Sequence, residues 1–435
     1  MEKPVYYAAT EGGDYAFAVS AAAMKFGAGV LAELGDDARA QGLKRVALFI
    51  DPEVADTAPA EVATASLKRA GIDAVVYDEI AVEPTDTSFL AAADFARDGK
   101  FDGFVSLGGG STMDTAKAAN LYATHPADFL AYVNLPYGEF RAVPGPLKPH
   151  IACPTTSGTG SETTSTAVMD ITALKVKTAI SNRMLKPTLA LVDPTTTRTL
   201  PAGVVASTGF DVLTHAIESY TARPYTTRSR PKSPDQRPVF QGANPYSDVG
   251  SLEAIRLGGK YLVRAVENAD DHEARHMLML AATMAGLSFG NAGVHLPHAM
   301  SYGVAGLCHT WRAAGYEKAA PMVPHGIAVV LNAPTAFRFT AAAAPERHLA
   351  AAEALGADTR NAAPEHGGEL LAGRLIEMMR QTGLPNGTGA LGFTEADIPD
   401  LVERGYNQPR LVVLAPCNVT KDDVAAMYRN GLRYW

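Results

Sequence analysis

The chain has 435 residues, of which 47% are hydrophobic and 19% are charged, and these proportions exclude an intrinsically disordered protein. The formal charge of −8 argues against nucleic acid or an anionic membrane surface as the main partner. At about 150 residues per domain, the length predicts two or three domains.

Cysteine usage and the first residues bear on the cellular compartment. Cys153, Cys308 and Cys417 are widely spaced and form neither a disulfide framework nor a CxxC metal motif, which favours a reducing environment. The first twenty residues hold one basic side chain, Lys3, and resemble neither a secretory signal nor an Arg-rich transit peptide. We therefore expect a cytoplasmic protein.

The first half of the chain alternates short apolar runs with helical patterns. Strands alternating with helices predict a doubly wound, mostly parallel α/β sheet. We assign this sheet to a dinucleotide-binding domain over residues 1–198. The predicted strands cover residues 46–51, 74–80, 104–107, 150–156 and 189–194.

Two glycine-rich loops follow predicted strands in this half. LGGGSTMDTAK (107–117) opens a helix, so its backbone can approach a phosphate closely and the helix N-terminus offers free N–H donors. PTTSGTGSE (154–162) follows the next strand, and both loops are expected at the carboxyl edge of the sheet, where ligands bind. The alternative for the first loop is a glycine turn without a ligand.

Two further features bear on the choice of dinucleotide. Asp51 ends the first predicted strand, where a carboxylate accepts hydrogen bonds from a ribose and repels a 2′-phosphate, which favours NAD over NADP. The alternative for Asp51 is a turn residue before Pro52. GAGVLA (27–32) also fits a glycine fingerprint, but no clear strand precedes it and we do not expect a dinucleotide there.

After Pro201, long Ala- and Leu-rich helical stretches predict an all-α domain over residues 199–435. Residues 277–311 contain no Asp, Glu, Lys or Arg, but polar residues, prolines and glycines interrupt them, which favours a buried helix and its exit loop over a membrane span. Residues 223–248 hold five prolines and five cations, and form either a solvated surface loop or an active-site insertion.

A set of histidines and one carboxylate in this second half suggests a metal site. In GFDVLTHAIESY, Asp211 and His215 are four residues apart and share one helix face. His295, His298 and His325 follow. One carboxylate with three imidazoles suits Fe(II) or Zn(II) and leaves a position open for a substrate oxygen. Core histidines and a surface Asp–His pair are the alternatives.

The motifs GGGSxxDxAK, TTSGTGSE, GFDVLTHAIESY, HxxHAMSY and VPHG occur in the order found in the iron-containing, group III alcohol dehydrogenases. The chain resembles this family over essentially its whole length. The resemblance implies the dehydroquinate-synthase-like architecture, with a dinucleotide-binding domain and a helical metal-binding domain. It also implies NAD(H) and one divalent metal, Fe²⁺ or alternatively Zn²⁺. The implied metal ligands are Asp211, His215, His298 and His325, and the implied cofactor contacts are Gly109, Gly110, Ser111, Asp114, Thr155, Thr156, Ser157 and Lys177.

Several other stretches resemble the branch of this family that passes hydride between a hydroxy acid and an oxo acid. That resemblance implies transfer from 4-hydroxybutyrate to 2-oxoglutarate through bound NAD(H), giving succinate semialdehyde and 2-hydroxyglutarate. The alternatives are a dehydrogenase that releases its cofactor, a non-catalytic NAD-binding protein, and a metal-dependent lyase on the related fold. The stretches are RPVFQGANPYSD (237–248), NAGVHLPHAMSY (291–302), PERHL (345–349), LGADTR (355–360) and LAPC (414–417).

The chain departs from the family pattern at one position. A second histidine usually follows the third metal ligand by four residues, and here Tyr302 takes its place, so Tyr302 and His295 are both candidates for the proton path. The resemblance also implies small-molecule partners and a homo-oligomer of two or more copies. A substrate carboxylate requires a cation, and the insertion offers Arg228, Arg230, Lys232 and Arg237.

Overall fold

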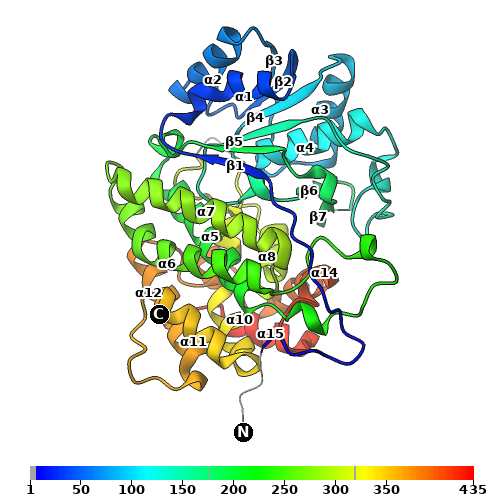
Figure 1. Ribbon diagram of the computed structural model, residues 1–435. Coiled ribbons are helices and arrows are strands. Elements are labelled where there is room, and N and C mark those ends of the chain that lie inside the picture. The colour runs from blue at the N-terminus through cyan, green and yellow to red at the C-terminus, as the bar shows by residue number, and fades with distance from the viewer. Residues whose placement is uncertain (1–5, 175, 318–319) are drawn as a thin grey trace. The chain divides into compact units, whose positions relative to one another are not determined.

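The computed structural model describes residues 6–174, 176–317 and 320–435. By their contacts these residues form two compact units (Figure 1): Ala21–Thr199, and Leu200–Trp435 together with the described residues up to Ser20. The first-domain range of 1–198 proposed from sequence assigned the opening residues to the sheet, whereas residues 6–20 pack with the helical unit. We call residues 6–20 the N-terminal arm.

The unit of residues 21–199 is built on a six-stranded parallel sheet in the order β1-β8-β5-β4-β2-β3 (Figure 1). A separate antiparallel hairpin pairs β6 with β7. The predicted parallel α/β sheet and its five predicted strands are confirmed, while β1, β6 and β7 were not predicted. The strands are β1 (Ala23–Phe26), β2 (Arg45–Ile50), β3 (Asp73–Tyr77), β4 (Gly103–Gly108), β5 (His150–Pro154), β6 (Thr166–Ile171), β7 (Val176–Ser181) and β8 (Leu189–Val192).

Helices cover both faces of this sheet. Along β2, Leu48 points toward the α1 and α2 side, and its neighbours Ala47 and Phe49 point toward α3 and α4. A strand buried on both faces forms a continuous apolar run, which is why β2 was recognisable in the sequence. The helices of this unit are α1 (Leu34–Ala40), α2 (Ala58–Arg69), α3 (Asp86–Asp98) and α4 (Gly110–Thr124).

The edge strand β1 corrects one expectation. It lies directly before GAGVLA, where no strand was expected. Its four residues are partly or largely exposed because β1 is at the edge of the sheet, so they lack the apolar pattern of a buried strand. A short 3₁₀ turn, Val30–Glu33, and not a long helix, follows the glycines.

The strand order reverses beside β2, which adjoins β3 on one side and β4 on the other. In doubly wound sheets, ligands bind outside the carboxyl ends of the strands at such a reversal. Asp51 follows β2, the glycine loop follows β4, and Thr155 follows β5. The topology therefore brings the predicted cofactor residues of three strands to one edge.

The second unit is helical, with one large core made mainly by α5, α6 and α7 and the helices that follow. The helical stretches predicted at 251–266 and 273–289 fall within α6 and α7, and those predicted at 349–355 and 368–382 end one residue beyond α11 and α12. No single helix among the described residues has the length and apolar character to cross a membrane. Only α7 and α8 taken together reach that length and composition, and they are bent by 103° relative to each other. The helices are α5 (Ala202–Thr221), α6 (Pro245–Glu267), α7 (His272–Ala292), α8 (Leu296–Leu307), α9 (His325–Val330), α10 (Ala333–Thr340), α11 (Pro345–Ala354), α12 (Gly367–Gln381), α13 (Ile398–Tyr406), α14 (Pro409–Val412) and α15 (Lys421–Asn430).

Candidate metal centre and cofactor loops

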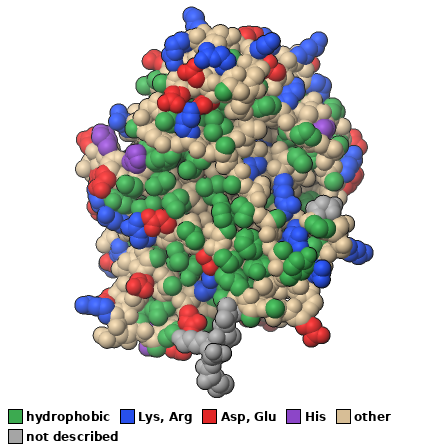
Figure 2. Space-filling model, in the orientation of Figure 1, with side chains coloured by type: hydrophobic (Ala, Val, Ile, Leu, Met, Phe, Trp, Pro, Cys, Tyr) green, Lys and Arg blue, Asp and Glu red, His purple; other side chains and the backbone are tan. Residues whose placement is uncertain are grey.

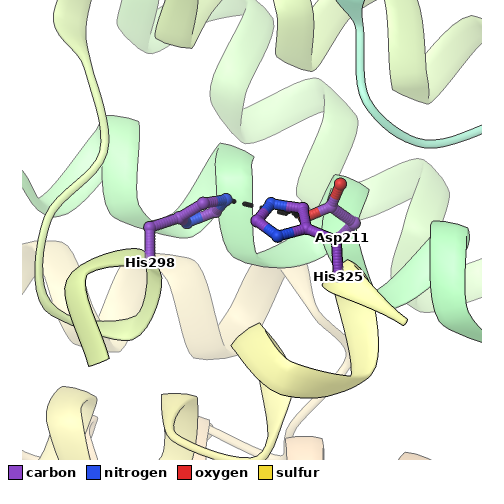
Figure 3. A group of neighbouring side chains, drawn as sticks. All are labelled: Asp211, His298 and His325. Atoms are coloured by element: carbon purple, nitrogen blue, oxygen red, sulfur yellow. Dashed lines mark ion pairs between the residues drawn. The ribbon is translucent and has the colours of Figure 1, made fainter. Parts of the chain in front are cut away.

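Three helices of the second unit bring a carboxylate and two imidazoles together. Asp211 lies on α5, His298 in the first turn of α8, and His325 at the start of α9, and the side chains of both histidines point toward Asp211 (Figure 3). Asp211 Oδ1 is 3.5 Å from His298 Nε2 and 3.8 Å from His325 Nε2. One ligand atom from each residue lies within 4.8 Å of the others, which is a spacing that a single metal ion can bridge.

The fourth predicted ligand, His215, lies one turn after Asp211 on α5. Its Nδ1 is 3.8 Å from Asp211 Oδ2, and its ring stacks on Phe289 with 3.9 Å between centroids. Three atoms of this group are buried and have no hydrogen-bond partner among the residues that the structure describes: Asp211 Oδ1, His215 Nδ1 and His298 Nε2. Buried polar atoms are rarely left unpaired, and a carboxylate with imidazoles is a common donor set for Fe(II) and Zn(II). The residues therefore fit a divalent metal.

Glu218 belongs to this centre and was not selected from the sequence. It is fully buried on α5, and its carboxylate accepts hydrogen bonds from His298 Nδ1 and from the backbone N–H groups of His295, at 2.8 Å, and His298, at 3.2 Å. It follows Asp211 by seven residues, so it lies on the same face of α5. That spacing was a usable signal. Glu218 fixes the first turn of α8 and presents the other nitrogen of His298 to the metal position.

The charges of the centre shift its ionisation. Burial disfavours charge on Asp211, but the facing imidazoles outweigh burial and hold the pKa of this carboxyl well below its usual range. Burial lowers the pKa of His215 to about 3, so this imidazole is neutral and able to bind a metal. Burial also opposes protonation of His298, but Glu218 and Asp211 outweigh it and raise its pKa to about 9. His298 therefore sits where positive charge is favoured on both sides of its ring.

The sharp connection between α7 and α8 sets the direction of the α8 helix that carries His298, and residues from distant motifs contact each other at this connection. Gly293 ends α7 with φ of +91°, a conformation that favours glycine. A Cβ at this position would lie 2.4 Å from Leu414 and 2.9 Å from Phe240. Three stretches that are far apart in sequence thus meet at one glycine beside α8: RPVFQGANPYSD, NAGVHLPHAMSY and LAPC.

The two proton-path candidates occupy different surroundings. His295 is fully buried at the start of α8, where its Nε2 lies 3.1 Å from the Thr221 hydroxyl, and burial lowers its pKa to about 4. Tyr302 lies one turn beyond His298, and its hydroxyl oxygen accepts a hydrogen bond of 2.7 Å from Arg410. Tyr302 also shares an apolar cluster with Phe289, whose ring stacks on His215.

The two glycine-rich loops of the other unit lie side by side. The Thr155 N–H donates to the Gly108 carbonyl at 3.0 Å, and a Cβ on Gly110 would lie 2.7 Å from the Thr159 side chain. α4 begins at Gly110, and its N-cap residue Gly109 has no side chain to cap the helix, so the first N–H groups of α4 can bind an anion. The Thr156 hydroxyl is buried, and no described residue forms a hydrogen bond with it. These groups fit the phosphates of a dinucleotide.

The other predicted cofactor residues have different surroundings. Burial raises the pKa of Asp51, whose Oδ1 accepts from the Glu53 N–H at 2.9 Å. Asp114 is bound internally, because its carboxylate accepts from the Ser161 hydroxyl at 2.5 Å and the Val168 N–H at 2.9 Å. Three more complete the set: Lys177 forms ion pairs with Glu83 and Asp170, the Ser111 hydroxyl accepts from the Glu83 N–H, and Ser157 is buried.

The N-terminal arm forms ion pairs with two of the four cations that were predicted to bind a substrate carboxylate. Asp14 is 2% exposed and forms ion pairs with both Arg228 and Arg237. Arg230 is exposed and its guanidinium lies 4.5 Å from the centre of the Tyr15 ring. Lys232 is exposed. The insertion and the arm thus hold each other.

Comparison with known proteins bears on identity. A model of the iron-containing alcohol dehydrogenases matches residues 21–194, and a model of the C-terminal part of the Fe-containing alcohol dehydrogenase family matches residues 239–432. A hydroxyacid-oxoacid transhydrogenase, mitochondrial, from Bos taurus is 49% identical over 424 residues, which is 97% of this chain and 91% of the relative.

Solved structures agree with these matches. A 1,3-propanediol oxidoreductase superposes with a TM-score of 0.83 at 27% identity, covering 96% of this chain and 100% of the other. An iron-containing alcohol dehydrogenase from Thermococcus thioreducens gives a TM-score of 0.80 at 26% identity, covering 96% and 99%. The predicted combination of a parallel α/β sheet with a helical unit is confirmed.

The comparisons overturn the expected cytoplasmic location, since the transhydrogenases of Bos taurus and Homo sapiens, each 49% identical to this chain, are named mitochondrial. The expectation was wrong because it rested on free thiols and on the first twenty residues. Free thiols indicate a reducing environment, which does not distinguish one reducing compartment from another.

Proposed function

Because this chain belongs to the iron-containing alcohol dehydrogenase family and is an oxidoreductase acting on CH–OH groups, we propose that it transfers hydride from a hydroxy acid to an oxo acid through resident NAD(H). The proposed pair is 4-hydroxybutyrate and 2-oxoglutarate, which become succinate semialdehyde and 2-hydroxyglutarate. The observation that carries the proposal is the meeting of three transhydrogenase-like motifs at Gly293, beside the metal-binding helix. The names of the relatives support it.

We propose that the helical unit binds the metal and that the unit of residues 21–199 binds the dinucleotide. Asp211, His215, His298 and His325 hold the divalent metal, for which Fe²⁺ is proposed and Zn²⁺ is the alternative. The glycine loop before α4 and the hydroxyls after β5 hold the dinucleotide phosphates, and Asp51 binds the ribose. When bound, the metal supplies a Lewis acid for the substrate oxygen and NAD(H) accepts and returns hydride.

The residues around the centre prepare it for this chemistry. Asp211 contributes the single negative charge of the ligand set, so the charge of a divalent cation is only partly neutralised and remains available to polarise a substrate oxygen. Glu218 keeps the His298 ring oriented. Phe289, Val294 and Leu411 form an apolar wall near the centre, and water exclusion by such a wall strengthens electrostatic interactions.

Tyr302 is the proposed proton-path residue, in preference to His295. Arg410 donates to the Tyr302 oxygen, so the phenol proton is left free for another acceptor. His295 is fully buried and its Nε2 is engaged with Thr221. Tyr302→Phe is expected to lower hydride-transfer turnover at neutral pH by about 100-fold, the scale of general acid–base catalysis, with metal content unchanged. An unchanged rate would remove Tyr302 from the proton path.

The reaction itself is testable by mass balance. Metal-loaded protein is incubated with 4-hydroxybutyrate and 2-oxoglutarate, with and without added NAD, and both products are followed by mass spectrometry. Equal formation of succinate semialdehyde and 2-hydroxyglutarate without added cofactor is the expected result. Turnover that requires added NAD and accumulates free NADH would identify a dehydrogenase that releases its cofactor.

We also propose that the protein is a homo-oligomer. Hydrophobic side chains spread across the middle of the face drawn in Figure 2. Tyr246 and Val249, in the first turns of α6, are 41% and 72% exposed. Light scattering coupled to size-exclusion chromatography measures the mass directly, and a single species of monomer mass would contradict the proposal.

A further inference from the structure

Arg410 is a half-buried cation near the metal-binding helix α8. It lies on α14 and donates to the Tyr302 hydroxyl at 2.7 Å, with its guanidinium carbon 5.9 Å from the ring centre. Within residues 6–174, 176–317 and 320–435, no carboxylate forms an ion pair with it. A guanidinium has five N–H donors, and a neutral phenol uses only one. Most of its donors and its whole charge remain available.

Two contacts place Arg410 on the same side of α8 as the metal ligands. Tyr302 follows His298 by four residues, so both side chains project from one face of the helix about one turn apart. Leu411, the next residue after Arg410, shares an apolar cluster with Tyr302 and Phe289, and the Phe289 ring stacks on His215. Arg410 is thus connected to His298 through Tyr302 on α8, and to His215 through Leu411 and Phe289, the latter on α7.

The cations of the insertion are less suited to a substrate carboxylate. Arg228 and Arg237 are paired with Asp14, and Arg230 and Lys232 are exposed. Two other arginines of this unit are also engaged. Arg347 forms an ion pair with Asp248, and Arg223 donates to the carbonyls of Ala415 and Cys417.

We propose that Arg410 binds the carboxylate of both substrates, with Tyr302 holding its guanidinium in place. This inference rests on the proposed function. In both substrates the carboxylate lies at the same distance along the chain from the reacting carbon, so one cation in a fixed position can bind either of them. In 4-hydroxybutyrate, two methylenes separate the carboxylate from the carbon that loses hydride, and in 2-oxoglutarate two methylenes separate the distal carboxylate from the carbon that gains it. A forked guanidinium binds a carboxylate through two parallel hydrogen bonds, which fixes distance and direction together.

The test measures kcat/KM for wild type and for Arg410→Gln and Arg410→Lys on ω-hydroxy acids of three, four and five carbons, with 1-butanol as the uncharged substrate. We expect wild type to favour the four-carbon acid. Arg410→Gln should lower kcat/KM for that acid by about 10- to 100-fold, the scale of a charge-assisted hydrogen bond, and flatten the chain-length preference. Turnover of 1-butanol should fall clearly less than turnover of the four-carbon acid, because 1-butanol has no carboxylate for Arg410 to bind. Arg410→Lys should recover part of the acid activity without the full length preference.

Lys232→Gln is the matched control, because it removes an exposed cation of the insertion. Thermal unfolding and metal content are measured for every variant, so that a folding defect is not read as a loss of recognition. Equal losses on the acid and on 1-butanol, or an intact chain-length preference in Arg410→Gln, would overturn the role of Arg410 while the proposed function stands. A wild-type enzyme that oxidises 1-butanol and no hydroxy acid would overturn the proposed function, and this inference with it.

Discussion

At the residue scale, Glu218 has the clearest untested role. Its carboxylate accepts from His298 Nδ1 and from two backbone N–H groups at the start of α8. Glu218→Gln keeps the size of the side chain but removes the negative charge beside His298 Nδ1, which favours a metal cation at Nε2 on the other side of the His298 ring. Loss of such a supporting carboxylate typically weakens metal affinity by about 10- to 100-fold. Competition with a fluorescent chelator measures the affinity for Zn²⁺ and, under anaerobic conditions, for Fe²⁺.

Glu253→Gln is the control for this substitution, because Glu253 lies in the same helical unit and its ion pair with Arg256 is on the surface. Its metal affinity should match that of wild type, since exposed pairs contribute little. If Glu218→Gln also binds metal with wild-type affinity, Glu218 serves only to cap α8.

At the element scale, the N-terminal arm should depend on the charge of Asp14. Asp14 is buried against Arg228 and Arg237, and the Ser20 N–H at the end of the arm donates to the Asn291 side chain near the end of α7. Burial opposes charge on Asp14, but the two arginines outweigh burial and hold the pKa of its carboxyl well below its usual range. Asp14→Asn leaves two guanidinium groups without their anion, and we expect the free energy of unfolding to fall by about 3 kcal/mol at pH 7.

The dependence on pH has a defined sign. A lowered folded-state pKa means that the unfolded chain takes up the proton first, so the contribution of Asp14 is complete above about pH 5 and is lost progressively as the pH falls toward the folded value. The difference in stability between wild type and Asp14→Asn should therefore begin to shrink as the pH falls below about 5, and it should go on shrinking below about pH 3 because the folded-state pKa is lowered. Urea unfolding followed by circular dichroism measures it. Asp358→Asn, which removes an exposed pair with Arg360, should differ from wild type by less than about 0.5 kcal/mol.

Elements with a strong apolar pattern were predictable from the sequence, and elements fixed by tertiary contacts were not. The strands buried on both faces were found because their residues are continuously apolar, whereas β1 has a partly exposed pattern at the sheet edge. The hairpin of β6 and β7 packs against α4 and not within the main sheet, so it does not continue the alternation of strands and helices. The arm was assigned to the wrong neighbour because it docks through residues far away in the sequence, as Asp14 does with Arg228 and Ser20 with Asn291, and such contacts have no local signature.

At the scale of the whole molecule, the sequence indicated which residue types belong to the site but not which of them are already engaged. The four predicted metal ligands come from three helices of one unit, and the structure brings Asp211, His298 and His325 together. The order of the motifs does not reveal that Asp14 holds Arg228 and Arg237, because the partners are separated by more than two hundred residues. Nor does it show that Arg410 lies beside Tyr302, since α14 reaches α8 only through the folding of the helical unit.

The division into two units leads to a prediction about the whole molecule. The candidate metal ligands all lie in the unit that contains residues 200–435, and the candidate cofactor residues all lie in the unit of residues 21–199. His298→Ala should therefore abolish detectable binding of Zn²⁺ or Fe²⁺, while the dissociation constant for NAD⁺ stays within about threefold of wild type, a change below 1 kcal/mol. Isothermal titration calorimetry with NAD⁺ and metal analysis of the same samples measure both.

Thermal unfolding supplies a second measure of the same prediction. A ligand that binds only the folded chain stabilises it by about 2.7 kcal/mol at a hundred times its dissociation constant, so metal should raise the Tm of wild type and leave that of His298→Ala unchanged. His272→Ala is the control, because His272 is exposed at the start of α7, and it should keep the full metal-dependent shift. If His298→Ala instead loses NAD⁺ binding together with the metal, the two ligands do not bind to separate units of the chain.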